Sequence, residues 1–169
     1  MKTALIGLTL AATLFAVPLV KRDVLNSLEK GFSQSLVASE MEILGYPSGL
    51  YIDGTGIVFT SEINLSYAPR VDPFQQVIPP ATRVKVHDKE LQQLPILREL
   101  MVQLLLKSSV TLDTLPPGEK IVVGVKLTHQ AWEDKTGFPD QIVMQGVKSK
   151  LMDAKFGRVP PTSVIQVQE

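Results

Sequence analysis

The sequence predicts an α+β domain in which an antiparallel sheet, built from two β-hairpins, is covered by one long helix and by shorter helices. Three observations support this fold class. Apolar residues recur at helical spacing in the stretches 23–39 and 84–112. Runs rich in β-branched residues come in two pairs, and the first pair flanks an Asp-Gly turn signal. Helices and hairpins in this order pack as a helical layer on one face of a sheet.

The first helix is predicted from Asp23 to about Ser39. Its capping residue is either Asp23 or Asn26, and Glu29 stands at the capping-box distance from Asn26. Apolar residues at helical spacing form one face that we expect to be buried: Leu25, Leu28, Phe32 and Leu36.

The first hairpin is predicted around Asp53-Gly54-Thr55-Gly56. The runs 41–46 and 50–52 precede this turn, and the run 57–65 follows it. Asp and Gly tolerate the positive φ that tight hairpin turns require, so these runs are expected to pair as antiparallel strands.

The next segment combines a loop with the longest helix. Four prolines between Ala68 and Thr82 predict an irregular loop, and a loop of this length is either functional or mobile. A helical stretch runs from Val84 to about Leu112, and Pro95 is expected to divide it into a short helix and a main one with Pro95 in its first turn. Apolar residues on several sides of the main helix predict deep packing: Leu97, Leu100, Met101, Leu104, Leu105 and Leu106.

The second hairpin is predicted in the last third of the chain. Pro116-Pro117-Gly118 ends the helix, and the β-branched run Ile121–Leu127 follows as a strand. A polar turn at 131–140 leads from this strand to the next element. A short last strand is expected at 164–167.

The segment 141–145 has two interpretations. Asp140 is a suitable cap for a helix that would run to Ala154. We favour a strand followed by a helix at about 148–154, because Gly146 interrupts the run and the strand would then form a hairpin with its predecessor.

The N-terminal segment has the charge pattern of a signal peptide. Lys2 precedes an uncharged run from Thr3 to Val20, which ends at Lys21-Arg22. This pattern predicts export from the cytoplasm, to the periplasm or the extracellular space.

Cleavage of this segment is expected after Ala16, which makes residues 1–16 the signal peptide. Leu14 is a mediocre residue at the −3 position of that site. The alternative is an uncleaved inner-membrane anchor that extends to about residue 22, because the run reaches the lower end of the roughly 17–25 residues that span a bilayer. In both cases residues 23–169 are expected to form a single α+β domain.

Composition excludes several classes of function. Lys plus Arg equals Asp plus Glu at 17 each, so the charge balance offers no reason to bind nucleic acid or an anionic membrane. We therefore expect no nucleic-acid partner, and membrane contact only through an uncleaved N-terminal segment. The chain has no cysteine, which excludes disulfides, thiolate metal sites and cysteine nucleophiles.

Neither a cofactor nor a metal site is expected from the motifs. Gly54-x-Gly56 precedes a predicted strand, whereas a phosphate-binding loop must lead into a helix. His87 and His129 are the only histidines, and neither has the spacing of a zinc-binding pair. The sequence therefore predicts a melting temperature that a chelator leaves unchanged.

One loop holds the best candidates for a ligand-binding site. It combines an aromatic surface, an imidazole and two acids, a set that suits a carbohydrate or a cation: His129, Trp132, Glu133 and Asp134. An enzyme would need a further acid from elsewhere, and Asp53 and Glu62 are the candidates. The alternative is structural, because a lone Trp among charges commonly covers the edge of a domain.

Several strings resemble a family of uncharacterised exported bacterial proteins. They span most of the chain after the N-terminal segment and comprise residues 51–62, 115–124, 132–134 and 141–145. The resemblance implies that the protein consists of a signal peptide followed by this single domain. It implies no activity, substrate or catalytic residue.

Two functions are compatible with these observations. The leading hypothesis is a non-catalytic exported protein of the envelope or periplasm that acts through contacts with a protein partner, because the sequence holds no catalytic constellation. The competing hypothesis is a small secreted hydrolase or carbohydrate-binding protein that uses the loop around Trp132. A concave pocket that gathers Trp132, a histidine and two carboxylates from different segments would favour the second hypothesis.

Overall fold

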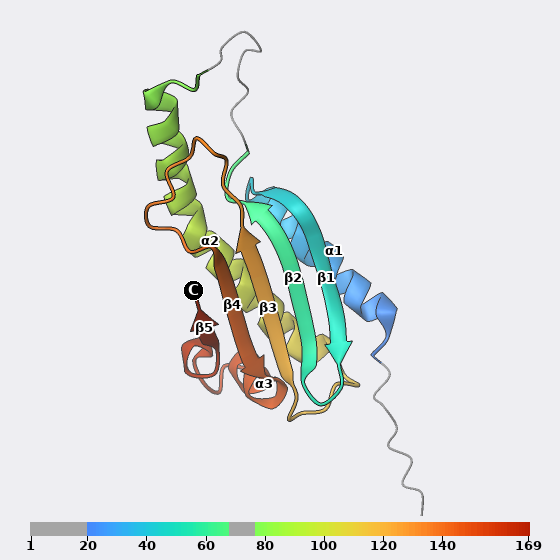
Figure 1. Ribbon diagram of the computed structural model, residues 1–169. Helices are drawn as coiled ribbons and strands as arrows, with labels where there is room; N and C mark the ends of the chain where they lie inside the picture. Colours follow the sequence, from blue (N-terminus) through green and yellow to red (C-terminus); the bar gives the residue numbers. More distant parts are fainter. Residues whose placement is uncertain (1–19, 68–76) are drawn as a thin grey trace, which may run out of the picture.

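The computed structural model describes residues 20–67 and 77–169. The predicted signal peptide and most of the predicted Pro-rich loop fall in residues 1–19 and 68–76, which lie outside the described residues. The elements follow one another in the predicted order (Figure 1). They are α1 (Arg22–Ala38), β1 (Glu42–Ile52), β2 (Gly56–Asn64), α2 (Pro80–Thr111), β3 (Lys120–Leu127), β4 (Gln141–Val147), α3 (Lys148–Lys155), a short 3-10 helix (Pro161–Ser163) and β5 (Gln166–Gln168).

The described strands form one five-stranded sheet in the order β1-β2-β3-β4-β5. Both predicted hairpins are present as antiparallel pairs, and β5 pairs antiparallel with β4. β2 and β3 run parallel, because α2 carries the chain back along the sheet between them (Figure 1). The predicted α+β class, with two hairpins in a mostly antiparallel sheet, is confirmed.

The helices cover one face of this sheet. In Figure 1 both α1 and α2 lie behind the strands. The predicted apolar face of α1 is buried, and α2 packs its own apolar residues over β3 and β4. The main core therefore lies between the sheet and these two helices. Its side chains from α2 include Leu97, Met101, Leu104 and Leu105.

The predicted division of the long helix at Pro95 is wrong, since α2 is a single helix with Pro95 inside it. Proline has no N–H for the carbonyl of Leu91, and its ring crowds that carbonyl. Both residues lie on the exposed side of α2, where water can solvate the free carbonyl while the buried side holds the helix in place.

The predicted loop 68–82 ends earlier than expected, at Pro79. Pro79 and Pro80 occupy the N-cap and first helical positions of α2, where a missing N–H is tolerated.

The predicted capping box of α1 is not formed. Lys21 occupies the N-cap position, and no side chain caps the helix. Glu29 faces β1 instead: its Oε1 accepts a hydrogen bond of 2.7 Å from the backbone N–H of Gly49 and lies 3.1 Å from the guanidinium of Arg22. The N–H of Gly49 is on a buried residue of the edge strand, where an unpaired donor would be costly. Glu29 therefore pairs with the N–H of Gly49 rather than forming the capping box.

The ambiguous segment 141–145 is a strand. Ile142 and Met144 are both buried in β4, which pairs with β3 along its whole length. Residues two apart lie on the same face of a strand but on nearly opposite sides of a helix, so only a strand buries both. α3 follows directly, as predicted.

Candidate functional site

The loop 128–140 between β3 and β4 lies against the first half of α2 (Figure 1). His87 of α2 places its Nδ1 3.1 Å from the carbonyl oxygen of Asp134, and its ring meets Phe138 edge to face at 5.3 Å. A carbonyl oxygen only accepts, so this geometry puts a proton on Nδ1 of His87. The backbone N–H of Thr136 donates to Oδ1 of Asp134 at 2.9 Å. The helix and the loop together thus build a surface that neither forms alone.

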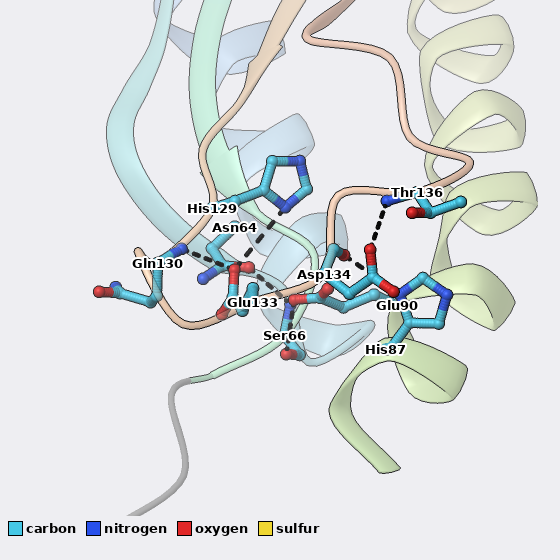
Figure 2. A network of polar contacts seen from close by, with 9 residues as sticks. All are labelled: Asn64, Ser66, His87, Glu90, His129, Gln130, Glu133, Asp134 and Thr136. Atoms are coloured by element: carbon cyan, nitrogen blue, oxygen red, sulfur yellow. Dashed lines mark hydrogen bonds and ion pairs between the residues drawn. The ribbon is translucent and has the colours of Figure 1, made fainter. Parts of the chain in front are cut away.

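Three side chains meet between α2 and this loop: Glu90, His129 and Glu133 (Figure 2). Each offers one ligand atom, and these atoms lie within 4.8 Å of one another. Glu90 is 0% exposed, and the side chains of His129 and Glu133 are 4% and 2% exposed. We call this set the Glu-His-Glu cluster. Two buried carboxylates beside an imidazole are unfavourable unless other groups pair with them.

Hydrogen bonds satisfy the cluster only in part. Oε1 of Glu90 accepts a hydrogen bond of 3.2 Å from the hydroxyl of Ser66, and Oε2 of Glu133 accepts one of 2.6 Å from the backbone N–H of Gln130. Three buried atoms have no hydrogen-bond partner among the described residues: Oε2 of Glu90, Oε1 of Glu133 and Nδ1 of His129. Nδ1 of His129 lies 3.7 Å from Oε2 of Glu133, which is too long for a hydrogen bond.

Burial also changes the protonation of the cluster. Desolvation and then the negative charge of Glu133 raise the pKa of Glu90 to about 7, against opposing effects of Ser66 and His87. Desolvation lowers the pKa of His129, although the nearby Glu133 acts in the opposite direction. The imidazole of His129 is therefore neutral at neutral pH and keeps a lone pair for a donor or a cation.

A surface cleft adjoins the cluster. Trp132 is half-buried beside it, and Arg83 contributes hydrogen-bond donors from α2. Hydrogen bonding by Thr136 lowers the pKa of Asp134, so this carboxylate is charged at neutral pH. Glu133 belongs to both the cleft and the Glu-His-Glu cluster. The cleft has a volume of about 570 Å³ and is lined by Pro80, Arg83, Val84, His87, Ala131, Trp132, Glu133 and Asp134.

The two additional acids predicted from the sequence lie elsewhere. Asp53 is in the turn between β1 and β2, at the opposite end of the sheet (Figure 1), and accepts a hydrogen bond of 3.3 Å from the hydroxyl of Tyr51. Glu62 pairs with Lys126 at 2.9 Å and accepts a hydrogen bond from Thr128. Neither acid lines the cleft or joins the cluster.

The sequence analysis missed Arg83, which lines the cleft, and the cluster residue Glu90. Glu90 stands four residues before Leu94 and seven before Leu97, so it occupies the buried side of α2. The signal available in the sequence was a glutamate at the helical spacing of two leucines that are buried. The spacing of four between His129 and Glu133 was a second signal, although these residues lie in a loop rather than on a helix.

Comparisons with protein-family models, with curated proteins and with solved structures found no match for this chain. The resemblance to a family of uncharacterised exported proteins therefore stays a prediction. Within residues 20–67 and 77–169, the helices lack the length or the apolar character needed to cross a bilayer. The geometry of the cleft and of the cluster is the basis for the proposals that follow.

Proposed function

We propose that the protein is an exported binding protein that holds a carbohydrate-type ligand in the cleft beside Trp132. The observation that carries this proposal is the convergence of Trp132, His87, Arg83 and the carboxylate of Asp134 on one concave surface. Glu133 also lines the cleft, but its side chain is only 2% exposed and its carboxylate belongs to the buried Glu-His-Glu cluster with Glu90, so the expected pair of carboxylates from different segments is not formed on the cleft. The proposal of export rests on the charge pattern of the N-terminal segment.

The chemistry of the cleft supports a polyhydroxylated ligand. Its volume lies within the roughly 300–1,000 Å³ that is typical of small-molecule sites. The flat face of Trp132 suits the apolar face of a sugar ring, and its amphipathic ring tolerates partial exposure. Arg83 supplies donors and Asp134 supplies acceptors, which together match the mixed hydrogen bonding of hydroxyl groups.

The carboxylates favour binding over hydrolysis. A glycosidase needs two carboxyl groups that both reach the sugar, about 5 to 9.5 Å apart across the bond to be broken. Glu133 and Asp134 are neighbours in one loop, and Glu90 is fully buried. Among the described residues, no pair of carboxylates therefore faces the cleft from two sides.

Tryptophan fluorescence tests this proposal directly, because Trp132 is the only tryptophan of the chain. We expect soluble oligosaccharides, with chitotetraose and maltotetraose as probes, to shift its emission in a saturable way for at least one of them. Arg83→Ala should weaken that binding by about tenfold, which corresponds to one lost hydrogen bond to a charged group. Lys85→Ala is the matched control, since Lys85 is an exposed cation on the same helix outside the cleft.

The emission of Trp132 would be unchanged by both oligosaccharides if the cleft takes no sugar. An equal loss of affinity in the Arg83 and Lys85 variants would also contradict the proposal, because it would indicate a general effect of surface charge. Circular dichroism of both variants checks that the fold is intact.

A second candidate function is contact with a protein partner of the envelope through the outer face of the sheet. No described helix covers this face (Figure 1). A hollow of about 290 Å³ beside Tyr46, bordered by Glu62 and Lys126, would suit an apolar side chain flanked by polar groups. Exposed apolar patches of this kind often mark interaction sites. β1, which borders this face, exposes Leu44, Tyr46, Leu50 and Ile52.

Photo-crosslinking in intact cells distinguishes this second function. A photoreactive amino acid in place of Tyr46, which is 78% exposed, should give one discrete crosslinked species. The same amino acid in place of Phe156, an aromatic residue that is 60% exposed at the end of α3, is the control and should give none. Identical products from both positions would contradict a specific contact at the outer face.

A further inference from the structure

We propose that the Glu-His-Glu cluster binds a divalent transition-metal cation of the Zn²⁺ type through Glu90, His129 and Glu133. This inference does not depend on a ligand in the neighbouring cleft. It goes beyond the proposed binding function, because the metal would join α2 to the loop 128–140 whether or not a sugar binds.

The first argument is the set of donor atoms. The cluster brings two carboxylates and one imidazole within 4.8 Å of one another from segments far apart in the sequence. Each of these side chains has a buried atom without a hydrogen-bond partner among the described residues. Buried polar atoms in folded proteins are nearly always paired, so three unpaired atoms at one point indicate a missing partner. A cation would satisfy all three atoms at once.

The second argument is the support around the cluster. Ser66 donates to the second oxygen of Glu90, and the backbone N–H of Gln130 donates to the second oxygen of Glu133 (Figure 2). Metal-binding carboxylates are characteristically oriented by such outer hydrogen bonds, which leave one oxygen of each group free. Here the free oxygens are the ones without partners among the described residues, Oε2 of Glu90 and Oε1 of Glu133.

The ligand types select the class of metal. Imidazole together with carboxylate suits Zn²⁺ and its transition-metal neighbours, whereas Ca²⁺ takes six to eight oxygen ligands and Mg²⁺ keeps an octahedral shell. Three protein ligands leave one position of a tetrahedral Zn²⁺ site for water. Bonds of about 2.1 Å place ligands roughly 3.4 Å apart, so side-chain rotations would need to close the 4.8 Å spread by on the order of 1 Å.

A single buried water molecule is the rival occupant. It would donate to the two free carboxylate oxygens and accept a hydrogen bond from Nδ1 of His129. In that arrangement Nδ1 of His129 carries a proton, whereas a metal would bind its lone pair. The two occupants can be distinguished by adding metal. If the cluster holds a metal, the affinity for added Zn²⁺ depends on these three residues, whereas a water site gives no such dependence.

Calorimetric titration of ZnCl₂ into the untagged protein, after treatment with a chelator and its removal, tests the proposal. We expect one Zn²⁺ per chain with a micromolar or tighter Kd, and a melting temperature that rises by roughly 5 °C at saturating metal. CaCl₂ at the same concentration should change neither quantity. Co²⁺ should give the visible absorption of a tetrahedral site, which reports direct coordination of the metal by protein ligands.

Two variants and one control make the test specific. Glu90→Gln and His129→Gln should each weaken Zn²⁺ binding by at least a hundredfold, and both keep the approximate size of the side chain. Glu99→Gln changes an exposed glutamate on the same helix and should bind Zn²⁺ like the original chain. Unchanged affinity in folded Glu90→Gln and His129→Gln proteins would overturn the proposal, as would the absence of any heat of Zn²⁺ binding. The metal-free expectation from the sequence would then hold.

Discussion

Replacing Gly56 with Ala is expected to destabilise the protein by about 4 kcal/mol or more, or to prevent folding altogether. Gly56 has a φ of +124°, and a Cβ atom at this position would overlap the carbonyl oxygen of Lys120 and lie 2.8 Å from its backbone nitrogen. The two residues pair at the start of the parallel β2–β3 ladder. Backbone on both sides is fixed by strand pairing, so no flexible side chain can move aside. Urea denaturation of the variant measures the loss.

Gly54→Ala is the matched control for this prediction. Gly54 has a φ of +71°, but no atom of the described residues would lie within 4 Å of a Cβ added there. Only the backbone preference is therefore lost, at about 1–2 kcal/mol. Asp53→Asn keeps the turn propensity and should leave stability nearly unchanged. Equal losses for the two glycine variants would show that the contact between Gly56 and Lys120 is not as close as the structure places it.

Leu105→Ala is expected to lower the free energy of unfolding by about 2–5 kcal/mol. Leu105 is 0% exposed and lies in the core between α2 and the sheet. The loss has two sources, the transfer energy of the removed atoms and the cavity that the surrounding side chains cannot fill. Leu104 is also buried but borders a shallow surface hollow, so Leu104→Ala should fall at the lower end of this range.

Leu91→Ala provides the comparison on the same helix. Leu91 is 41% exposed, and its truncation should change stability by less than about 1 kcal/mol. Thermal and urea denaturation of the three leucine variants should rank them as Leu105, Leu104 and Leu91. A Leu105 variant as stable as the Leu91 variant would mean that α2 buries a different face.

Local sequence signals were sufficient for most elements. The β-rich runs on either side of Asp53-Gly54 and the Pro-Pro-Gly run at 116–118 act over a few residues. The first hairpin forms at the expected turn, and the long helix ends before the prolines. For 141–145 the local pattern leaves a helix open, and a strand is favoured because Gly146 interrupts the run and a strand could pair with its predecessor; the structure has β4 there. For the candidate site, the loop with His129 and its neighbours was recognisable because its residues are close together in the sequence.

Contacts between distant segments decided the other features. Glu29 accepts a hydrogen bond from Gly49 of β1 instead of capping α1. Pro95 lies inside α2, where the opposite side of the helix is packed in the core. In the sequence alone His129 and Glu133 have no visible third ligand, since Glu90 lies on another element. Only the packing of α2 against the loop brings Glu90 to them.

The order of the elements, the buried face of α1 and the position of the loop around Trp132 thus follow from the chain's local pattern. Helical periodicity and turn preference depend on residues within about four positions of one another, so a sequence displays them directly. The parallel joining of β2 to β3, the continuity of α2 and the Glu-His-Glu cluster depend on long-range packing. Their free energies come from burial and from pairing between residues dozens of positions apart, and those terms take effect only when the whole domain has assembled.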